Sequence, residues 1–136
     1  MDRSVSEVMA DVKVRLSPDD SIRRAAARLR DARTGLAVVD ADGGGVFTER
    51  DLLRAISEGV DLDSARVGDH MTPQPVAVSA DTTLGEACDR MIERGVRHLL
   101  VAGADGAVTG VLNMRDVVGV LSGAAALGAV PPARGS

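Results

Sequence analysis

Gly45-Val46-Phe47-Thr48-Glu49-Arg50-Asp51 and Gly110-Val111-Leu112-Asn113-Met114-Arg115-Asp116 are two copies of one seven-residue pattern. Each copy has a glycine, two apolar residues, a small polar residue, two spacers and an aspartate. The apolar pair fits the end of a buried strand, and the polar residue fits the N-cap of a helix whose first turn holds the aspartate. That turn has unpaired N–H groups and a partial positive charge, so a carboxylate is stabilised there.

Two interpretations of this pattern remain open. In the first, Thr48 and Asp51 form a capping box, and the pattern only starts a helix. In the second, the strand end and helix start present a carboxylate to the hydroxyls of a sugar, beside free N–H groups that suit phosphate.

The wider sequence repeats in the same order around this pattern. Residues 5–9 are echoed by residues 67–71, and residues 17–22 by residues 79–84, both at a spacing of 62. Asp51 and Asp116 are 65 apart, so the first copy is three residues shorter between its middle strands. An internal repeat indicates two similar structural units. We divide the chain into repeat 1 (1–60), repeat 2 (61–122) and a flexible tail rich in Ala, Gly and Pro (123–136).

Each repeat has the apolar periodicity of a strand, a helix, two strands and a second helix. The expected fold class is α+β, with two βαββα repeats packed about a pseudo-twofold axis. The expected strands are 12–16, 36–39, 46–47, 75–78, 99–101 and 108–112. The expected helices begin at Ser21, Glu49, Thr83 and Asn113. The first helix is expected to end at Thr34-Gly35, the second at Gly59 and the third at a Gly95 C-cap, with a polar linker over 57–66.

Composition excludes several classes of partner. The 136 residues carry a net charge of −4, so no bulk attraction to nucleic acid or to an anionic membrane is expected. Phe47 is the only aromatic residue, which leaves no platform for stacking single-stranded bases. The sequence shows no signal peptide, lipidation motif or apolar run of membrane-spanning length, so the expected location is the cytoplasm.

Residues that carry chemistry are sparse. The single cysteine, Cys88, falls on the apolar face of a predicted helix and is expected in the core. No Cys/His cluster has metal-ligand spacing, and no nucleophile–base pair or Walker-type loop is visible. We therefore expect no metal, no catalytic residue and no enzymatic activity.

Together these features resemble the CBS domain, named for cystathionine β-synthase, and two in tandem resemble a CBS pair, or Bateman module. The resemblance rests on the Val-x-x-x-Met opening, the Ser/Thr helix start, the short apolar strand and the Gly-h-h-(Thr/Asn)-x-x-Asp pattern, each present twice. It covers residues 4–121. In that family the pairs commonly dimerise, and their clefts often bind AMP, ADP, ATP, S-adenosylmethionine or cyclic dinucleotides.

The resemblance implies sugar-binding residues in both repeats. The family's motif aspartate, which contacts ribose hydroxyls, corresponds to Asp51 and Asp116. Its preceding Ser/Thr, which contacts ribose or phosphate, corresponds to Thr48. Asn113 departs from Ser/Thr but is polar.

The resemblance also implies a phosphate-binding edge, mainly in repeat 2. The family's basic residues before the second strand are matched by Arg97 and His98, whereas repeat 1 has Gly35 there. With Arg115 as a further cation, we expect an anionic adenine nucleotide to prefer the Asp116 cleft.

The predicted function is a stand-alone regulatory protein that senses a nucleotide of the AMP, ADP or ATP class and signals to an unknown partner protein. The nucleotide is a regulatory ligand and not a required cofactor. The alternatives are a ligand-independent dimerisation or interaction scaffold, and a sensor of S-adenosylmethionine or a cyclic dinucleotide. A homodimer is expected, because the second helix of each repeat has more apolar residues than its inner face needs. These residues are Leu52, Leu53, Ile56, Val117, Val118, Val120 and Leu121.

Overall fold

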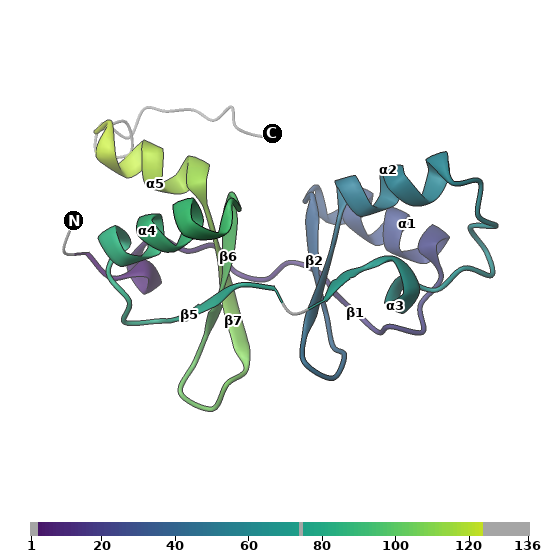
Figure 1. The fold of residues 1–136 in the computed structure, drawn as a ribbon, viewed down its shortest axis with the longest axis horizontal. Coiled ribbons are helices and arrows are strands. Elements are labelled where there is room, and N and C mark those ends of the chain that lie inside the picture. The colour runs from purple at the N-terminus through teal and green to yellow at the C-terminus, as the bar shows by residue number, and fades with distance from the viewer. Residues whose placement is uncertain (1–2, 74, 124–136) are drawn as a thin grey trace. The chain divides into compact units, whose positions relative to one another are not determined.

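The computed structural model describes residues 3–73 and 75–123 (Figure 1). The fold is α+β, as predicted. The chain divides into two units by its contacts, which we name the first unit, Val12–Pro75, and the second unit, Met1–Asp11 with Val76–Ser136. The predicted tail beyond residue 123 lies outside the described residues.

The first unit contains one sheet in the order β1-β2-β3-β4. Strand β1 is parallel to β2, and the β2–β3 and β3–β4 pairs are antiparallel. Its elements are β1 (Arg15–Leu16), α1 (Ile22–Ala32), β2 (Leu36–Val39), β3 (Gly45–Thr48), α2 (Glu49–Ser57), α3 (Val67–His70) and β4 (Thr72–Pro73).

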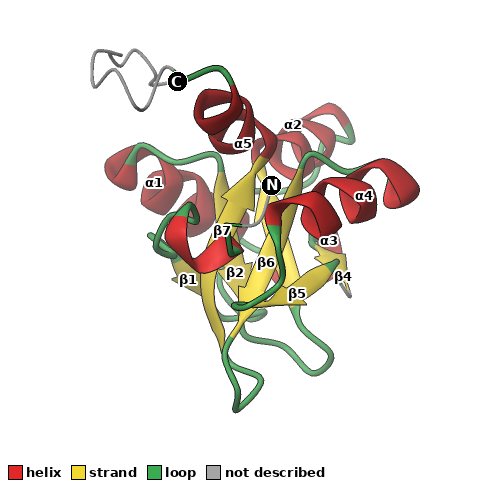
Figure 2. Cartoon of the chain, turned by 90° about the vertical axis from the view of Figure 1, so that its left-hand side faces the viewer, coloured by secondary structure: helices red, strands yellow, loops and turns green. Residues whose placement is uncertain are grey.

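The second unit repeats this plan with a sheet in the order β5-β6-β7. Strand β5 is parallel to β6, which is antiparallel to β7. Helices α4 and α5 lie beside this sheet (Figure 2). Its elements are the 3-10 turn η1 (Val5–Glu7), β5 (Ala77–Ser79), α4 (Leu84–Arg94), β6 (His98–Ala102), β7 (Val108–Asn113) and α5 (Met114–Leu121).

The segments that open the two repeats, residues 5–10 and 67–72, exchange places between the units. Val67 is buried in the core of the first unit, and Val5 is buried in the core of the second. Thr72 pairs with Val46 of β3, whereas Ala10 bridges to Val111 of β7. Each opening segment therefore pairs with a strand of the repeat to which it does not belong in sequence.

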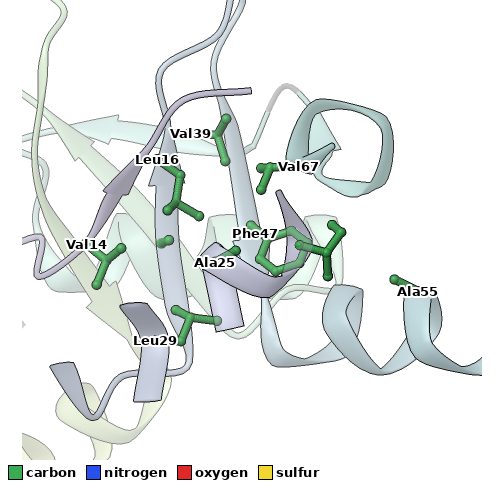
Figure 3. Close-up of a cluster of buried hydrophobic side chains, with 10 residues drawn as sticks. Val14, Leu16, Ala25, Leu29, Val39, Phe47, Ala55 and Val67 are labelled. Carbon is green, nitrogen blue, oxygen red and sulfur yellow. The ribbon is translucent and has the colours of Figure 1, made fainter. Parts of the chain in front are cut away.

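Each unit has its own apolar core. In the first, the Phe47 ring is fully buried, and Figure 3 shows it with Ala25 and Val67 around it. In the second, Leu99 and Leu112 of the sheet pack with residues of α4 and α5. Cys88 is partly buried against this second core, as its place in the helical pattern predicted.

Several predicted boundaries were wrong. Only the last two residues of the strand expected over 12–16 form a strand, β1. This strand lies at the edge of the sheet and pairs with β2 alone. Helix α1 ends at Ala32 because Arg33 turns into the left-handed region, at φ 56°. Helix α2 ends at Ser57, ahead of Gly59 with φ 75°. Helix α3 was not predicted, whereas the Gly95 C-cap is confirmed at φ 65°.

Among the described residues, no helix combines the length and the apolar character needed to cross a bilayer.

Candidate functional site

In the first unit, the repeated motif forms a complete capping box at the start of α2. Thr48 is the N-cap, and its hydroxyl accepts a hydrogen bond from the Asp51 N–H at 3.3 Å. In return, Asp51 Oδ2 accepts from the Thr48 N–H at 2.9 Å. The side chain of Asp51 is only 1% exposed. The capping interpretation of the motif therefore holds in this unit, and a reciprocal capping box is also present at the start of α5, between Asn113 and Asp116.

Two further side chains complete the surroundings of Asp51. Arg54 Nη1 donates to Asp51 Oδ1 at 3.1 Å, and the Thr72 hydroxyl donates to the same oxygen at 3.2 Å. The Thr48 hydroxyl also lies 3.2 Å from Oδ2. Because each carboxylate oxygen already has protein donors, a ligand hydroxyl would have to replace one of them.

In the second unit, the aspartate of the same motif accepts fewer hydrogen bonds. Asn113 is the N-cap of α5, and its Oδ1 accepts from the Arg115 N–H at 2.9 Å. Within the described residues, the half-buried Asp116 carboxylate accepts one hydrogen bond, from the backbone N–H of Asn113 at 3.4 Å. This contact is long for a hydrogen bond. Asp116 therefore keeps acceptor positions that Asp51 has already used.

The predicted basic residues of repeat 2 lie beside the start of α5. His98 is the register partner of Asn113 across the β6–β7 pair. The Arg97 carbonyl accepts from the Met114 N–H at 2.8 Å, which fixes the start of β6 against the first turn of α5. The side chains of Arg97 and Arg115 are exposed. The structure thus brings all five candidate residues of repeat 2 to one strand–helix junction.

The equivalent junction of the first unit has a different charge. The Gly35 carbonyl accepts from the Glu49 N–H at 3.1 Å, so Gly35 and Glu49 occupy the places of Arg97 and Met114. The Glu49 side chain covers Gly35, because a Cβ added there would lie 2.8 Å from Glu49 Oε1. A carboxylate thus stands where repeat 2 has a cation.

The sequence pattern did not identify Arg54 and Thr72, the two residues whose side chains make the first motif differ from the second. The signal for Arg54 was its place three residues after Asp51 on one helix face. Thr72 follows Met71 in an opening segment, and only the exchange of these segments places it near Asp51.

One groove among the described residues lies away from both motifs. It has a volume of about 460 Å³ and lies between β5 and α4, with Val78, Glu86 and Asp89 in its lining. No group of three or more His, Cys, Asp or Glu residues in the described ranges is placed to hold a metal ion.

Known proteins are similar to this chain in sequence and in fold. The model of the CBS domain family matches residues 5–58 and 67–123. The CBS domain protein PAE2072 from Pyrobaculum aerophilum, solved in complex with AMP, is 30% identical, with a TM-score of 0.76 over 90% of this chain and 99% of that one. CBSX2, a CBS-pair protein from Arabidopsis thaliana, in complex with AMP, is 28% identical, with a TM-score of 0.72 over 90% and 98% of the two chains.

A longer relative contains the same region. Arabinose 5-phosphate isomerase KdsD from Yersinia pestis is 34% identical over 106 residues, which are 76% of this chain and 32% of the isomerase. This chain therefore spans about a third of that enzyme's length.

Proposed function

The chain belongs to the CBS domain family, and from that premise we propose that it is a regulatory CBS pair that binds an adenosine nucleotide of the AMP, ADP or ATP class at Asp116. One observation carries the proposal: within the described residues the Asp116 carboxylate accepts a single hydrogen bond, of 3.4 Å, from the backbone N–H of Asn113. A carboxylate with unused acceptor positions suits the two vicinal hydroxyls of a ribose, which are both donors. The AMP complexes of PAE2072 and CBSX2 support the adenosine class.

The surroundings of Asp116 suit the phosphate end of such a ligand. Arg97 and Arg115 are exposed cations at the same strand–helix junction. Arginine binds phosphate through paired, charge-assisted hydrogen bonds. His98 adds a ring N–H that can donate a hydrogen bond. Asn113 starts the helix whose N-terminal dipole also favours an anion.

The proposed role is regulatory rather than catalytic. A ligand that binds at a strand–helix junction orders the groups that contact it, and a protein target can recognise the ordered form. On this proposal, the nucleotide changes the affinity of the pair for a second protein, and that protein changes the affinity for nucleotide by the same factor.

Two other ligand classes make different demands on the site. S-adenosylmethionine carries a positive sulfonium and has no phosphate for Arg97 and Arg115 to bind. A cyclic dinucleotide carries two nucleosides. We favour a mononucleotide, because Arg97 stands beside the second motif, whereas the equivalent residue of the first motif is Gly35, which the acid Glu49 covers.

We further propose that the protein is a homodimer. Leu53 and Ile56 on α2, and Val118 and Leu121 on α5, are between 52% and 66% exposed. Each pair is spaced i, i+3, so its members share one helix face. Exposed apolar faces of this kind mark interaction surfaces. The other predicted interface residues contribute less, since Val117 is buried and Leu52 and Val120 are partly buried against the cores.

Isothermal titration calorimetry with AMP, ADP and ATP tests the nucleotide proposal. Losing two hydrogen bonds to a charged group should weaken AMP binding on the order of a hundredfold in Asp116→Ala. The matched control is Asp89→Ala, which removes the same charge from an exposed position on α4 of the same unit and should leave binding unchanged. If millimolar AMP, ADP and ATP all fail to bind the unaltered protein, the proposal is wrong and the scaffold interpretation replaces it.

A further inference from the structure

Asp51 is the one buried charged residue in the ranges that the structure describes. Its carboxylate oxygens accept from the Thr48 N–H and from the side chains of Thr48, Arg54 and Thr72. A ribose diol that approached this carboxylate would find its acceptor positions in use. The first-unit motif is therefore satisfied by the protein itself.

Two of the side chains that donate hydrogen bonds to this carboxylate lie at the surface of the first unit. Thr72 is exposed, and the Arg54 side chain is 50% exposed, whereas Asp51 beneath them is 1% exposed. Thr72 is held in place by its pairing with Val46 on β3. Its hydroxyl lies 3.2 Å and 3.4 Å from the two oxygens of Asp51. One protein hydroxyl thus faces both oxygens, as a ligand hydroxyl would.

The second unit shows that the fold does not require this cover. Ala10 pairs with Val111 as Thr72 pairs with Val46, so Ala10 occupies the place of Thr72. An alanine side chain has no donor. Gly119 occupies the place of Arg54, at the repeat spacing of 65, and it has no side chain. Because both of these residues are small, neither of them covers Asp116.

We propose that Thr72 selects which of the two motifs takes the nucleotide, because its hydroxyl occupies the ligand-hydroxyl position on Asp51. This inference rests on the proposed nucleotide function. At Asp51, a ribose exchanges one hydroxyl contact for another and gains little. At Asp116, the same ribose makes contacts that the protein does not make. The pair then takes one nucleotide per chain.

Glu49 makes the first motif unfavourable for a phosphate group. Its carboxylate covers Gly35, the place that Arg97 occupies in the second unit. Arg50 matches Arg115 at the repeat spacing of 65. The difference in charge between the two motifs therefore comes from Glu49 in the first and Arg97 in the second. Removal of the Thr72 hydroxyl should therefore open the first motif to adenosine more readily than to AMP.

The test uses the full chain with Asp116→Ala, so that new binding reports the first motif. Thr72→Ala removes the hydroxyl and leaves its place empty, as Ala10 does in the second unit, whereas Thr72→Ser keeps the hydroxyl and Thr72→Val fills the same place with a methyl group. We expect Thr72→Ala/Asp116→Ala to bind adenosine at least about tenfold more tightly than Asp116→Ala alone, as expected for one regained hydrogen bond to a charged group. Thr72→Ser/Asp116→Ala and Thr72→Val/Asp116→Ala should show no gain. Addition of Glu49→Met should extend the gain to AMP.

Calorimetric stoichiometry separates failure of this inference from failure of the proposed function. Two AMP molecules per chain in the unaltered protein, or no gain from Thr72→Ala, would overturn the inference and leave the nucleotide function standing. If the unaltered protein binds no nucleotide, the function fails, yet a gain in adenosine binding from Thr72→Ala still supports a closed first motif. Circular dichroism verifies folding, and Thr72→Gly repeats the test if Thr72→Ala melts early.

Discussion

Arg33 and Gly95 adopt the same left-handed backbone conformation at the ends of equivalent helices. Arg33 has φ 56° and ψ 45° after α1, and Gly95 has φ 65° and ψ 34° after α4. Glycine enters this region without a steric penalty, whereas a residue with a Cβ does not. The two helices therefore end in the same way at different conformational cost.

Arg33→Gly should stabilise the protein. The left-handed conformation costs an L-residue roughly 1–2 kcal/mol, part of which is offset by the greater freedom of glycine in the unfolded chain. We expect the free energy of unfolding to rise by about 0.5–1 kcal/mol. Urea unfolding followed by circular dichroism measures this change, since the chain has no Trp or Tyr.

The control is Arg30→Gly, the same substitution inside α1. It should lower the free energy of unfolding by about 0.5–1 kcal/mol, because glycine weakens a helix interior. A loss of stability in both variants would show that the Arg33 side chain stabilises the fold by more than its backbone strain costs.

Gly110→Ala should destabilise the second unit more than Gly45→Ala destabilises the first. A Cβ at Gly110 would lie 3.0 Å from the Ala10 carbonyl oxygen, which is held in a bridge to Val111, and 2.5 Å from Met9 Sδ. A Cβ at Gly45 would meet mainly the flexible end of the Met71 side chain. Overpacking that a side chain cannot relieve costs about 1–3 kcal/mol. Unfolding of both variants in urea measures the difference, and equal losses would contradict it.

Much of the fold could be predicted because the sequence states it twice. The spacing of 62 between the openings aligned residues that the structure places equivalently, such as Leu36 and His98 at the starts of β2 and β6. The exchange of the opening segments could not be predicted, because Val5 and Val67, like Met9 and Met71, fit either core equally well by residue type. Which core each enters depends on tertiary packing.

The candidate site could be predicted in part. The capping role of Thr48 and Asp51 followed from their spacing and is confirmed. The difference in hydrogen bonding between Asp51 and Asp116 did not follow, because the hydroxyl of Thr72 comes from a segment 21 residues away. The cover that Glu49 forms over Gly35 depends on a side-chain conformation that spacing does not specify.

Ile56→Glu and Val118→Glu should each convert the proposed dimer to a monomer. Either change places a charge within an apolar helix face, where burial against a partner would remove its hydration. Light scattering at tens of micromolar should give twice the chain mass for the unaltered protein and the chain mass for the variants. Ile92→Glu on α4 is the control, since Ile92 is exposed but lies outside the proposed interface. A monomeric unaltered protein would contradict the dimer.

The effect of the Arg23–Asp63 ion pair on the pKa of Asp63 should be measurable by acid titration. Arg23 donates through Nε and Nη2 to both oxygens of Asp63, and these hydrogen bonds lower the pKa of Asp63 below its usual 3.8. Because the folded pKa is the lower one, the stabilisation is full above about pH 5 and is lost as the pH falls through the folded pKa. Carbon-13 NMR titration of the Asp63 carboxyl should show its pKa rise toward the usual value in Arg23→Gln. An unchanged pKa would show that the pair does not persist in solution.

Met114→Glu should make the second motif more selective against phosphate. Met114 occupies the place of Glu49, because its N–H donates to the Arg97 carbonyl as the Glu49 N–H donates to that of Gly35. A new carboxylate near Arg97 would compete with the phosphate for that cation. A charge pair near a protein surface is worth on the order of 1 kcal/mol after screening, so AMP binding should weaken roughly fivefold at low salt and less at high salt. Adenosine, which lacks the phosphate, should bind with little change. Met114→Gln has nearly the same shape without the charge and should bind both ligands as the unaltered protein does. If Met114→Glu weakened adenosine and AMP equally, the effect would be steric, and the phosphate would have to lie elsewhere than beside Arg97.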